Sequence, residues 1–242
     1  MITGSSERIS GALRNLAEAR QELPYGHAME AFHLEGPYIS PEDGPRGAHS
    51  RERVRPPNLD EFARFQDAAA GNLRLITISP EWPTATAFVE AVVSQGVVVS
   101  IGHTNASEQQ IADAVPAGAT LSTHLGNGAH KVLPRHPNYL WQQLAEDRLA
   151  ASFIADGIHL SDSFLRVALR AKGAERTVLV TDAIAAAMCE PGDYALGDVL
   201  VTLKDDGRVV MRGGDRLAGS SLRMDRAVEK LLSMGSSMPE AF

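Results

Sequence analysis

The sequence has one cysteine, no long hydrophobic run and no excess of basic residues, and each absence narrows the class of protein. The single cysteine, Cys189, cannot form a disulfide within the chain, which fits a reducing compartment such as the cytoplasm. No apolar run approaches the roughly 18 residues of a transmembrane helix, and residues 1–26 lack the apolar stretch of a secretory signal. The net charge of −7 argues against a nucleic-acid-binding surface. We therefore expect a cytoplasmic globular protein that binds neither membrane nor nucleic acid.

The chain alternates between short apolar runs and amphipathic helical stretches. The 242 residues are 44% hydrophobic, enough to bury a sizeable core. Six runs rich in β-branched residues lie at 31–39, 73–81, 96–104, 119–127, 149–157 and 176–183. Helical periodicity is found at 5–22, 59–70, 84–94, 107–114, 138–146, 161–171 and 222–234. This alternation predicts a parallel sheet covered by helices.

Polar residues collect at the carboxyl end of each apolar run. They are Glu35, Ser79, Glu81, His103, His124, Asp156, His159 and Asp182. In a (β/α)8 barrel the catalytic groups come from the carboxyl ends of several strands, whereas a doubly wound sheet binds ligands at one switch point. No GxGxxG phosphate loop follows any run, which also disfavours the doubly wound sheet. The pattern predicts a TIM-type barrel.

Six runs are two short of the eight strands of a closed barrel, so we expect an incomplete one. We interpret residues 1–242 as a barrel fragment that lacks the first strands, the C-terminal end and any accessory β-sandwich. An Asp-Gly turn between alternating runs predicts an inserted β-hairpin near 193–212. The Pro-rich, charged stretch 41–58 is expected to be a surface loop that carries substrate contacts.

Glu35, His103 and His124 form a candidate metal site. Each ends a different run, so all three could point into one barrel mouth. Two imidazoles and a carboxylate with an open position for water make a catalytic zinc-type ligand set. Iron and other divalent ions accept the same ligands, so zinc is only the first expectation. The alternative, polar strand-end residues satisfied by their neighbours, is harder to hold for three separate strand ends than for one.

Asp182 and His159 are candidates for the chemistry beside the metal. Asp182 ends the last apolar run, where a carboxylate could take a proton from water and pass it to a leaving group. It could equally cap a helix over 183–188. His159 follows Gly157 and is either structural or a contact to the substrate carbonyl.

Seven motifs, from about residue 28 onward, resemble the N-acetylglucosamine-6-phosphate deacetylases of the amidohydrolase superfamily in order and spacing. They are "HLEGPYIS", "SPE", "GHTNAS", "THLGNGAH", "ADGIHL", "LVTDA" and "LAGSSLRMDRAV". The resemblance implies hydrolysis of an N-acetyl group from an amino-sugar phosphate, with Glu35, His103 and His124 as metal ligands, Asp182 as the acid/base and His159 near the scissile amide.

The resemblance also implies a set of substrate contacts and a homodimer. The contacts fall on Ala48, His49, Asn127, Gly128, Leu217, Ala218 and Gly219. A phosphate-binding arginine, eleven residues after the second metal histidine, corresponds to Arg135 and reaches the partner's site.

Two departures from the family pattern leave alternatives open. Gly128 and Ala129 stand where the family has Ala and Met, so a different N-acetyl-amino-sugar is an alternative substrate. The segment around Arg135 also departs from the usual Gly-rich continuation. A cyclic amidase is weakened as an alternative, because 73–81 lacks the lysine that would bridge two metals. An inactive truncated barrel or a sugar-phosphate-binding protein is the non-enzymatic alternative.

Overall fold

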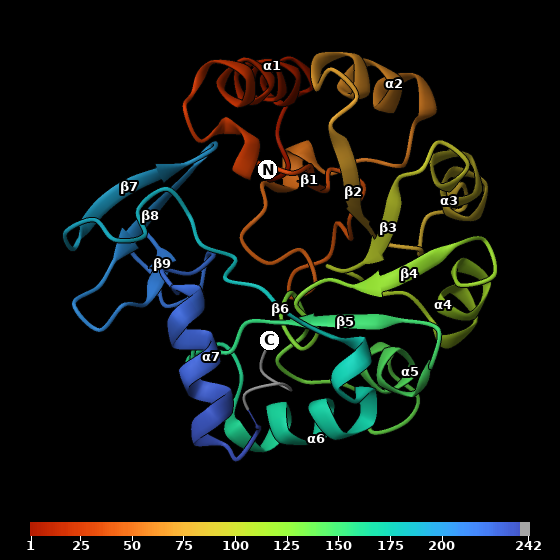
Figure 1. Cartoon of the computed structure of the whole chain (residues 1–242). Helices are drawn as coiled ribbons and strands as arrows, with labels where there is room; N and C mark the ends of the chain where they lie inside the picture. Colours follow the sequence, from red (N-terminus) through yellow and green to blue (C-terminus); the bar gives the residue numbers. More distant parts are fainter. Residues whose placement is uncertain (238–242) are drawn as a thin grey trace.

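The computed structural model describes residues 1–237, and its centre is a six-stranded parallel sheet in the order β1 to β6. The sheet curls as a barrel does, with helices on its outer side (Figure 1). The strands are β1 Phe32–Glu35, β2 Leu73–Ile78, β3 Val98–Ile101, β4 Ala119–Ser122, β5 Ala150–Phe153 and β6 Thr177–Leu179. All six predicted strands are therefore present in sequence order, and the predicted barrel architecture is confirmed.

Helices follow or precede the strands as predicted. They are α1 Ser6–Glu22, α2 Leu59–Ala68, α3 Ala85–Val93, α4 Glu108–Ala114, α5 Tyr139–Ala145, α6 Asp162–Lys172 and α7 Met224–Ser233. Short 3-10 helices lie at Gly26–Ala28, Arg51–Arg53 and Ala174–Arg176. Ser161 caps α6 by accepting a hydrogen bond from the Phe164 N–H, since a serine hydroxyl satisfies a free helix donor. Among the helices of residues 1–237, none combines the length and the hydrophobicity of a membrane span.

The two faces of the sheet differ in polarity, and this difference positions the site. Alternate strand residues such as Leu34, Ile76 and Val99 are fully buried against the helices. The residues between them, such as Thr77 and Ser100, are also buried but carry hydroxyls. Because successive side chains of a strand point to opposite faces, the polar residues line the inside of the curl. The polar residues predicted at the strand ends therefore lie next to a polar interior of the curled sheet.

Each edge of the sheet is extended by a short bridged segment. Ile2 forms a parallel bridge with Glu35, and the Glu35 N–H donates to the Met1 carbonyl at 2.7 Å. At the other edge Ala183 forms a parallel bridge with Ser220. No strand pairing joins these two segments in the described part of the chain, so the barrel is incomplete, as expected.

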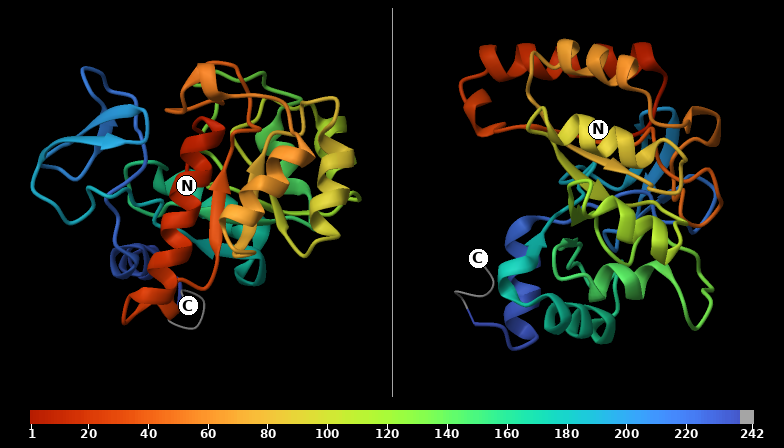
Figure 2. Two further views of the ribbon diagram at one scale, coloured as in Figure 1. Left: turned by 90° about the horizontal axis from the view of Figure 1, so that it is seen from above. Right: turned by 90° about the vertical axis from the view of Figure 1, so that its right-hand side faces the viewer.

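The inserted β-structure is a separate antiparallel sheet. It contains β7 Gly192–Leu196, β8 Val199–Leu203 and β9 Val209–Met211, in that order. The Asp206-Gly207 turn joins β8 to β9, as the sequence predicted, and a further turn at Gly197-Asp198 adds β7. Figure 2 shows this sheet standing apart from the curled sheet, and Figure 1 places it beside the open side of the curl.

Candidate active site

The predicted ligands lie where parallel strands end, at one mouth of the curled sheet. Glu35 is the last residue of β1, His103 lies two residues after β3 and His124 two residues after β4. The backbones of His103 and His124 have φ values of 47° and 28°, in the left-handed region. Such conformations cost a non-glycine residue of order 1–3 kcal/mol, and they cluster at functional sites. The fold therefore fixes both histidines at a local energetic cost.

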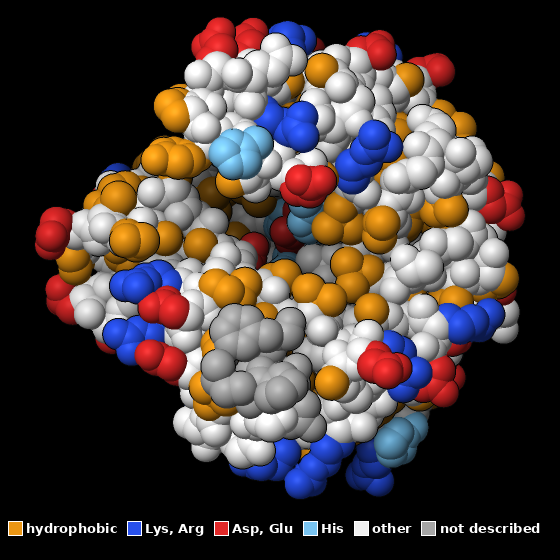
Figure 3. Space-filling model, viewed as in Figure 1, with side chains coloured by type: hydrophobic (Ala, Val, Ile, Leu, Met, Phe, Trp, Pro, Cys, Tyr) orange, Lys and Arg blue, Asp and Glu red, His pale blue; other side chains and the backbone are white. Residues whose placement is uncertain are grey.

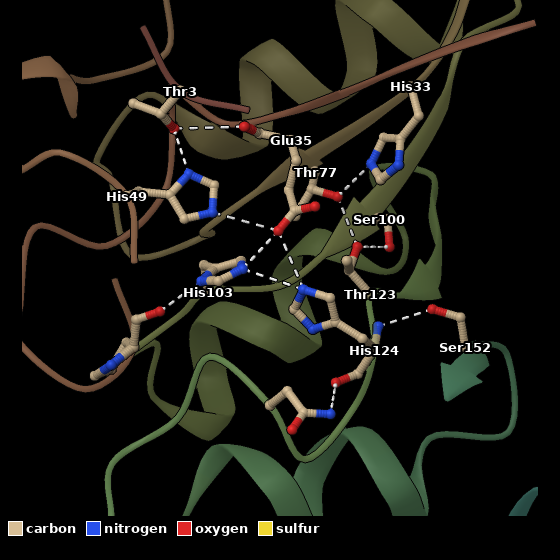
Figure 4. Close-up of polar contacts among 12 residues, drawn as sticks. Thr3, His33, Glu35, His49, Thr77, Ser100, His103, Thr123, His124 and Ser152 are labelled. Carbon is tan, nitrogen blue, oxygen red and sulfur yellow. Dashed lines mark hydrogen bonds and ion pairs between the residues drawn. The ribbon is translucent and has the colours of Figure 1, made fainter. Parts of the chain in front are cut away.

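The three side chains converge on one point (Figure 4). Glu35 Oε1 lies 2.6 Å from His103 Nε2 and 3.1 Å from His124 Nε2. The two Nε2 atoms are 3.1 Å apart. All three residues are buried, so little of each side chain is exposed to solvent. The structure thus brings the three predicted ligands together.

His49 is a fourth donor at the same point. Its Nε2 lies 3.4 Å from Glu35 Oε1, and its ring stands edge-on to that of His103, with centroids 4.4 Å apart. Glu35, His49 and His103 each offer a ligand atom, all within 4.8 Å of one another. Sequence reasoning assigned His49 only a substrate contact, because nothing local in "RGAH" indicates how close the 41–58 loop comes to β1.

The hydrogen bonds of His103 leave its Nε2 available to a cation. His103 Nδ1 lies 2.7 Å from the Pro45 carbonyl, which can only accept, so this nitrogen carries the proton. In the neutral ring, Nε2 then presents a lone pair to the Glu35 carboxylate and to His124. Lone pairs that converge at such distances repel unless a positive species lies between them. A proton or a divalent metal ion meets this requirement, and the donor set suits zinc or iron.

Electrostatics within the cluster place that proton on His124. Burial alone would raise the pKa of Glu35, but the positive charge of His124 and the close polar contacts with His103, His124 and His49 hold it well below its usual range. Burial opposes a charge on His124, yet Glu35 raises the pKa of His124 to about 9. Burial and the neighbouring His49 lower the pKa of His103. The cluster therefore binds one positive charge beside an ionised Glu35.

Asp182 faces the same mouth from the far side of the curl. Its backbone is left-handed, with φ of 49°, and its carbonyl accepts a hydrogen bond from the Ser220 N–H at 2.9 Å. Burial and the negative charge of Glu35 raise the pKa of Asp182. A carboxyl group that binds protons more tightly than usual suits an acid/base role. The alternative, that Asp182 caps a helix, is wrong, because Ala183 forms a β-bridge and residues 185–188 form a turn, with no helix over 183–188.

Asp156 orients His159, and sequence reasoning gave Asp156 no role. The Asp156 carboxylate lies 2.6 Å from His159 Nδ1, and its other oxygen accepts the backbone N–H groups of Ile158 and His159. A carboxylate can only accept, so Nδ1 carries the proton and Nε2 remains available to a ligand. The spacing "DGIH" was the only signal for this pair, and it indicated the histidine alone.

Comparisons with known proteins find similar sequences and solved structures. No family model matches the chain. The N-acetylglucosamine-6-phosphate deacetylase of Bacillus subtilis (strain 168) is 32% identical over 95% of this chain and 58% of its own length. The Homo sapiens enzyme of the same name is 36% identical over 90% and 54%. A solved structure from Mycobacterium smegmatis, a mutant N-acetyl-D-glucosamine-6-phosphate deacetylase in complex with N-acetyl-D-glucosamine-6-phosphate, superposes with a TM-score of 0.89 at 31% identity. The match covers all of this chain and 62% of the length of the Mycobacterium smegmatis chain.

Over most of its length the chain is similar to N-acetylglucosamine-6-phosphate deacetylases. The resemblance of the seven motifs is therefore confirmed. The chain spans less than two thirds of the length of these relatives. An N-acetylgalactosamine-6-phosphate deacetylase from Escherichia coli O157:H7 is also similar, at 31% identity over 98% of this chain and 62% of its own length.

A cavity of about 810 Å³ opens at the mouth of the curled sheet, and most of the residues suggested by the family resemblance line it. Figure 3 shows it as a hollow near the centre of this face, with histidine and acidic side chains in its depth. Its lining includes Glu35, Ala48, His49, His103, His124, Asn127, Gly128, His159, Asp182, Leu217, Ala218 and Gly219. Arg135 is exposed and does not line the cavity, whereas Lys131 and Arg216 do.

Gly128, where the sequence departs from the family pattern, lies very close to the His103 ring. Gly128 has a φ of 55°, and a Cβ there would lie 2.6 Å from His103 Nδ1. A Cβ at Gly47, on the loop that carries His49, would lie 2.9 Å from Cε1 of the same ring. A Cβ atom does not approach another heavy atom this closely, so both loops lie nearer to His103 than an alanine would permit without a shift. The loop that departs from the family pattern therefore packs directly against a predicted metal ligand.

Proposed function

We propose that the chain is a metal-dependent hydrolase that removes the N-acetyl group from N-acetylglucosamine 6-phosphate, giving glucosamine 6-phosphate and acetate. One observation carries this proposal. Glu35, His103 and His124 converge within 3.1 Å at the floor of a cavity that Asp182 also lines, in a chain whose relatives are named as such deacetylases. The donor set supports a divalent metal, with zinc as first candidate and iron as second.

The chemistry would proceed by attack of water on the acetyl carbon. A divalent ion, when bound, supplies Lewis-acid chemistry, lowering the pKa of water and polarising a carbonyl. The Asp182 carboxylate would take the proton of the attacking water and later donate it to the departing nitrogen. The raised pKa of Asp182 supports this double role, because its proton affinity lies closer to the working pH than that of an ordinary aspartate.

The other cavity residues would bind and orient the sugar. His159 Nε2, fixed by the Asp156 contact to Nδ1, would hold the substrate carbonyl. Backbone and side-chain groups of Asn127, Gly128 and the 217–219 segment would receive the sugar ring. Ala48 and His49 would complete the contacts from the opposite wall.

Arg135 would bind the phosphate of a partner subunit's substrate in a homodimer. Its exposure and its position outside the cavity of its own chain support a role across a subunit interface. A guanidinium matches phosphate oxygens with a fork of donors, which suits this role. We further propose that the enzyme works in the cytoplasm, where the single cysteine would remain reduced.

Acetate release by the purified, zinc-loaded chain tests the proposal. N-acetylglucosamine 6-phosphate, its galactosamine epimer and unphosphorylated N-acetylglucosamine are compared, before and after metal removal with a chelator. We expect turnover on the 6-phosphates that is lost on chelation and restored by zinc. His124→Ala should abolish zinc binding, while His136→Ala, at an exposed position, should not.

Two results would overturn parts of the proposal. A chain that binds zinc stoichiometrically but releases no acetate from any of the three sugars is not a deacetylase. A clear preference for the galactosamine epimer would keep the reaction and change the substrate.

A further inference from the structure

Glu81 lies at the junction of three loops beside the candidate metal centre. Its Oε2 accepts hydrogen bonds from Ser79 Oγ at 2.7 Å and from the Asn105 N–H at 2.8 Å. Its Oε1 accepts from Ser40 Oγ at 3.0 Å. The three donors follow β1, β2 and β3, so one carboxylate joins the carboxyl ends of three neighbouring strands.

Two of these donors bear on His103. The Ser40 backbone N–H donates to the His103 carbonyl at 2.8 Å, and Asn105 follows His103 by two residues. The loop that begins at Ser40 also supplies the Pro45 carbonyl, which accepts from His103 Nδ1. The main chain and the ring of His103 are therefore both held by a loop whose first residue is bonded to Glu81.

The carboxylate also fixes the direction of a buried hydroxyl chain. Ser79 gives its only hydroxyl proton to Glu81, so the Thr104 hydroxyl, 2.7 Å away, must donate to Ser79. Thr104 Oγ1 in turn accepts the Ala106 N–H at 2.9 Å. Ser79 and Thr104 are 0% and 2% exposed, so water does not replace a lost partner. The backbone on the C-terminal side of His103 is thus tied to Glu81 as well.

We infer that Glu81 is a positioning residue that holds His103 in its metal-binding conformation. His103 has a left-handed backbone, and such a conformation persists only where its surroundings over-determine it. Hydrogen bonds connect Glu81 to the backbone around His103. One connection runs through Ser40, and the others run through Ser79 to Thr104 and directly to Asn105. The inference rests on the metal centre of the proposed function.

Metal affinity and the spectrum of a bound probe ion test this role apart from activity. The probe is Co²⁺, whose d–d absorption reports the geometry of its ligands. Glu81→Ala should weaken Co²⁺ binding, measured against a competing chelator, by about 10- to 100-fold and alter the d–d bands. Glu81→Gln keeps an acceptor for Ser79 and Asn105 and can turn its amide toward Ser40. We therefore expect this conservative variant to bind within about threefold of wild type.

Controls separate this inference from the proposed function and from loss of fold. Glu90→Ala, at an exposed position on α3, should match wild type. A wild-type chain that binds no Co²⁺ overturns the metal centre itself, and this inference with it. Wild-type binding together with an unchanged affinity and spectrum in Glu81→Ala overturns the positioning role alone. If Glu81→Ala does not fold, Ser40→Ala provides the test, because it leaves Glu81 in place and removes the Ser40 hydrogen bond to it, together with the acceptor of the Glu42 N–H. It must weaken binding severalfold, and unchanged binding would refute the role.

Discussion

The Nε2 atoms of His103 and His124 lie 3.1 Å apart and face the same carboxylate oxygen. Two basic nitrogens at this separation cannot donate to each other when both rings are neutral with the proton on Nδ1. The pair is therefore placed to bind one positive charge, either a proton or a metal ion. This predicts how its metal affinity responds to pH and to substitution.

Asp182→Asn should keep the metal and lose the reaction. The amide has the same shape but cannot accept a proton from water, and general acid–base assistance is worth roughly 10²–10⁴ in rate. Elemental analysis and kcat measured on one preparation check this expectation. A variant that retains more than about a tenth of the wild-type kcat would remove Asp182 from the acid/base role.

Metal affinity should fall as the pH falls below about 9. The pKa of His124 is raised to about 9 by Glu35, so the ring carries a proton at pH 7 in the metal-free protein. An incoming ion must displace that proton, and the affinity should change by about tenfold per pH unit below this pKa. Zinc titrations against a competing chelator between roughly pH 6 and pH 9 measure the slope. An affinity independent of pH would show that His124 is not the protonated ligand.

Arg135→Ala should lower kcat/KM for the phosphorylated sugar far more than for unphosphorylated N-acetylglucosamine. Charge-assisted hydrogen bonds are worth roughly 1.5–3 kcal/mol each, which corresponds to a loss of about ten- to a hundredfold. Lys131→Ala and Arg216→Ala serve as comparisons, because both residues line the cavity mouth of their own chain.

Mixing two inactive variants tests whether Arg135 acts across an interface. Equal amounts of Arg135→Ala and Asp182→Asn, allowed to exchange subunits, should regain about a quarter of wild-type activity at low substrate, because only one site of each mixed dimer is intact. No recovery, with exchange shown by mass spectrometry, would place the phosphate contact within one chain, on Lys131 or Arg216.

Gly128→Ala should weaken metal binding. The added methyl group would meet His103 Nδ1 at 2.6 Å, and the backbone φ of 55° disfavours alanine. The loop or the ring must move, so we expect about tenfold weaker zinc affinity, of the size seen when a metal ligand loses its support. Gly213→Ala, also at positive φ but with open space around it, controls for backbone strain. Equal zinc affinity in the two variants would show that the Gly128 contact does not matter.

Lys172→Met should destabilise the fold without touching the site. Lys172 is 1% exposed, and its Nζ donates to the carbonyls of Gln143, Glu146 and Leu149 at 2.6, 2.9 and 2.9 Å. Removing the donor leaves buried carbonyls at the end of α5 without a partner, at a cost of about 3 kcal/mol in the free energy of unfolding. Urea denaturation measures it, with the exposed Lys204→Met as control. A loss as small as that of the control would mean that water replaces the lysine.

The sequence predicted those features that depend on local periodicity and on the polarity of strand ends. Every strand and helix of the curled sheet was expected, and so was the gathering of Glu35, His103 and His124, because parallel strands present their carboxyl ends at one edge. The approach of His49 to Glu35 was not foreseen, since it depends on the path of a long loop. The Ile2 bridge beside β1 was also missed, because an isolated bridge between two residues has no periodicity to detect. The strand β7 was missed because its Gly-Asp turn is a weaker signal than the Asp-Gly turn that follows.

The ring of His103 lies between two glycines, Gly47 and Gly128, on the two loops that we expect to receive the sugar. A screen for activity on a new substrate, applied to a library of variants in these loops, would therefore also select for variants that retain the metal. Variants with a side chain at either glycine would bind the ion more weakly, whatever their fit to a new sugar. Such a library should hold both glycines constant and vary the residues whose side chains point into the cavity, so that a gain in specificity can be measured on its own.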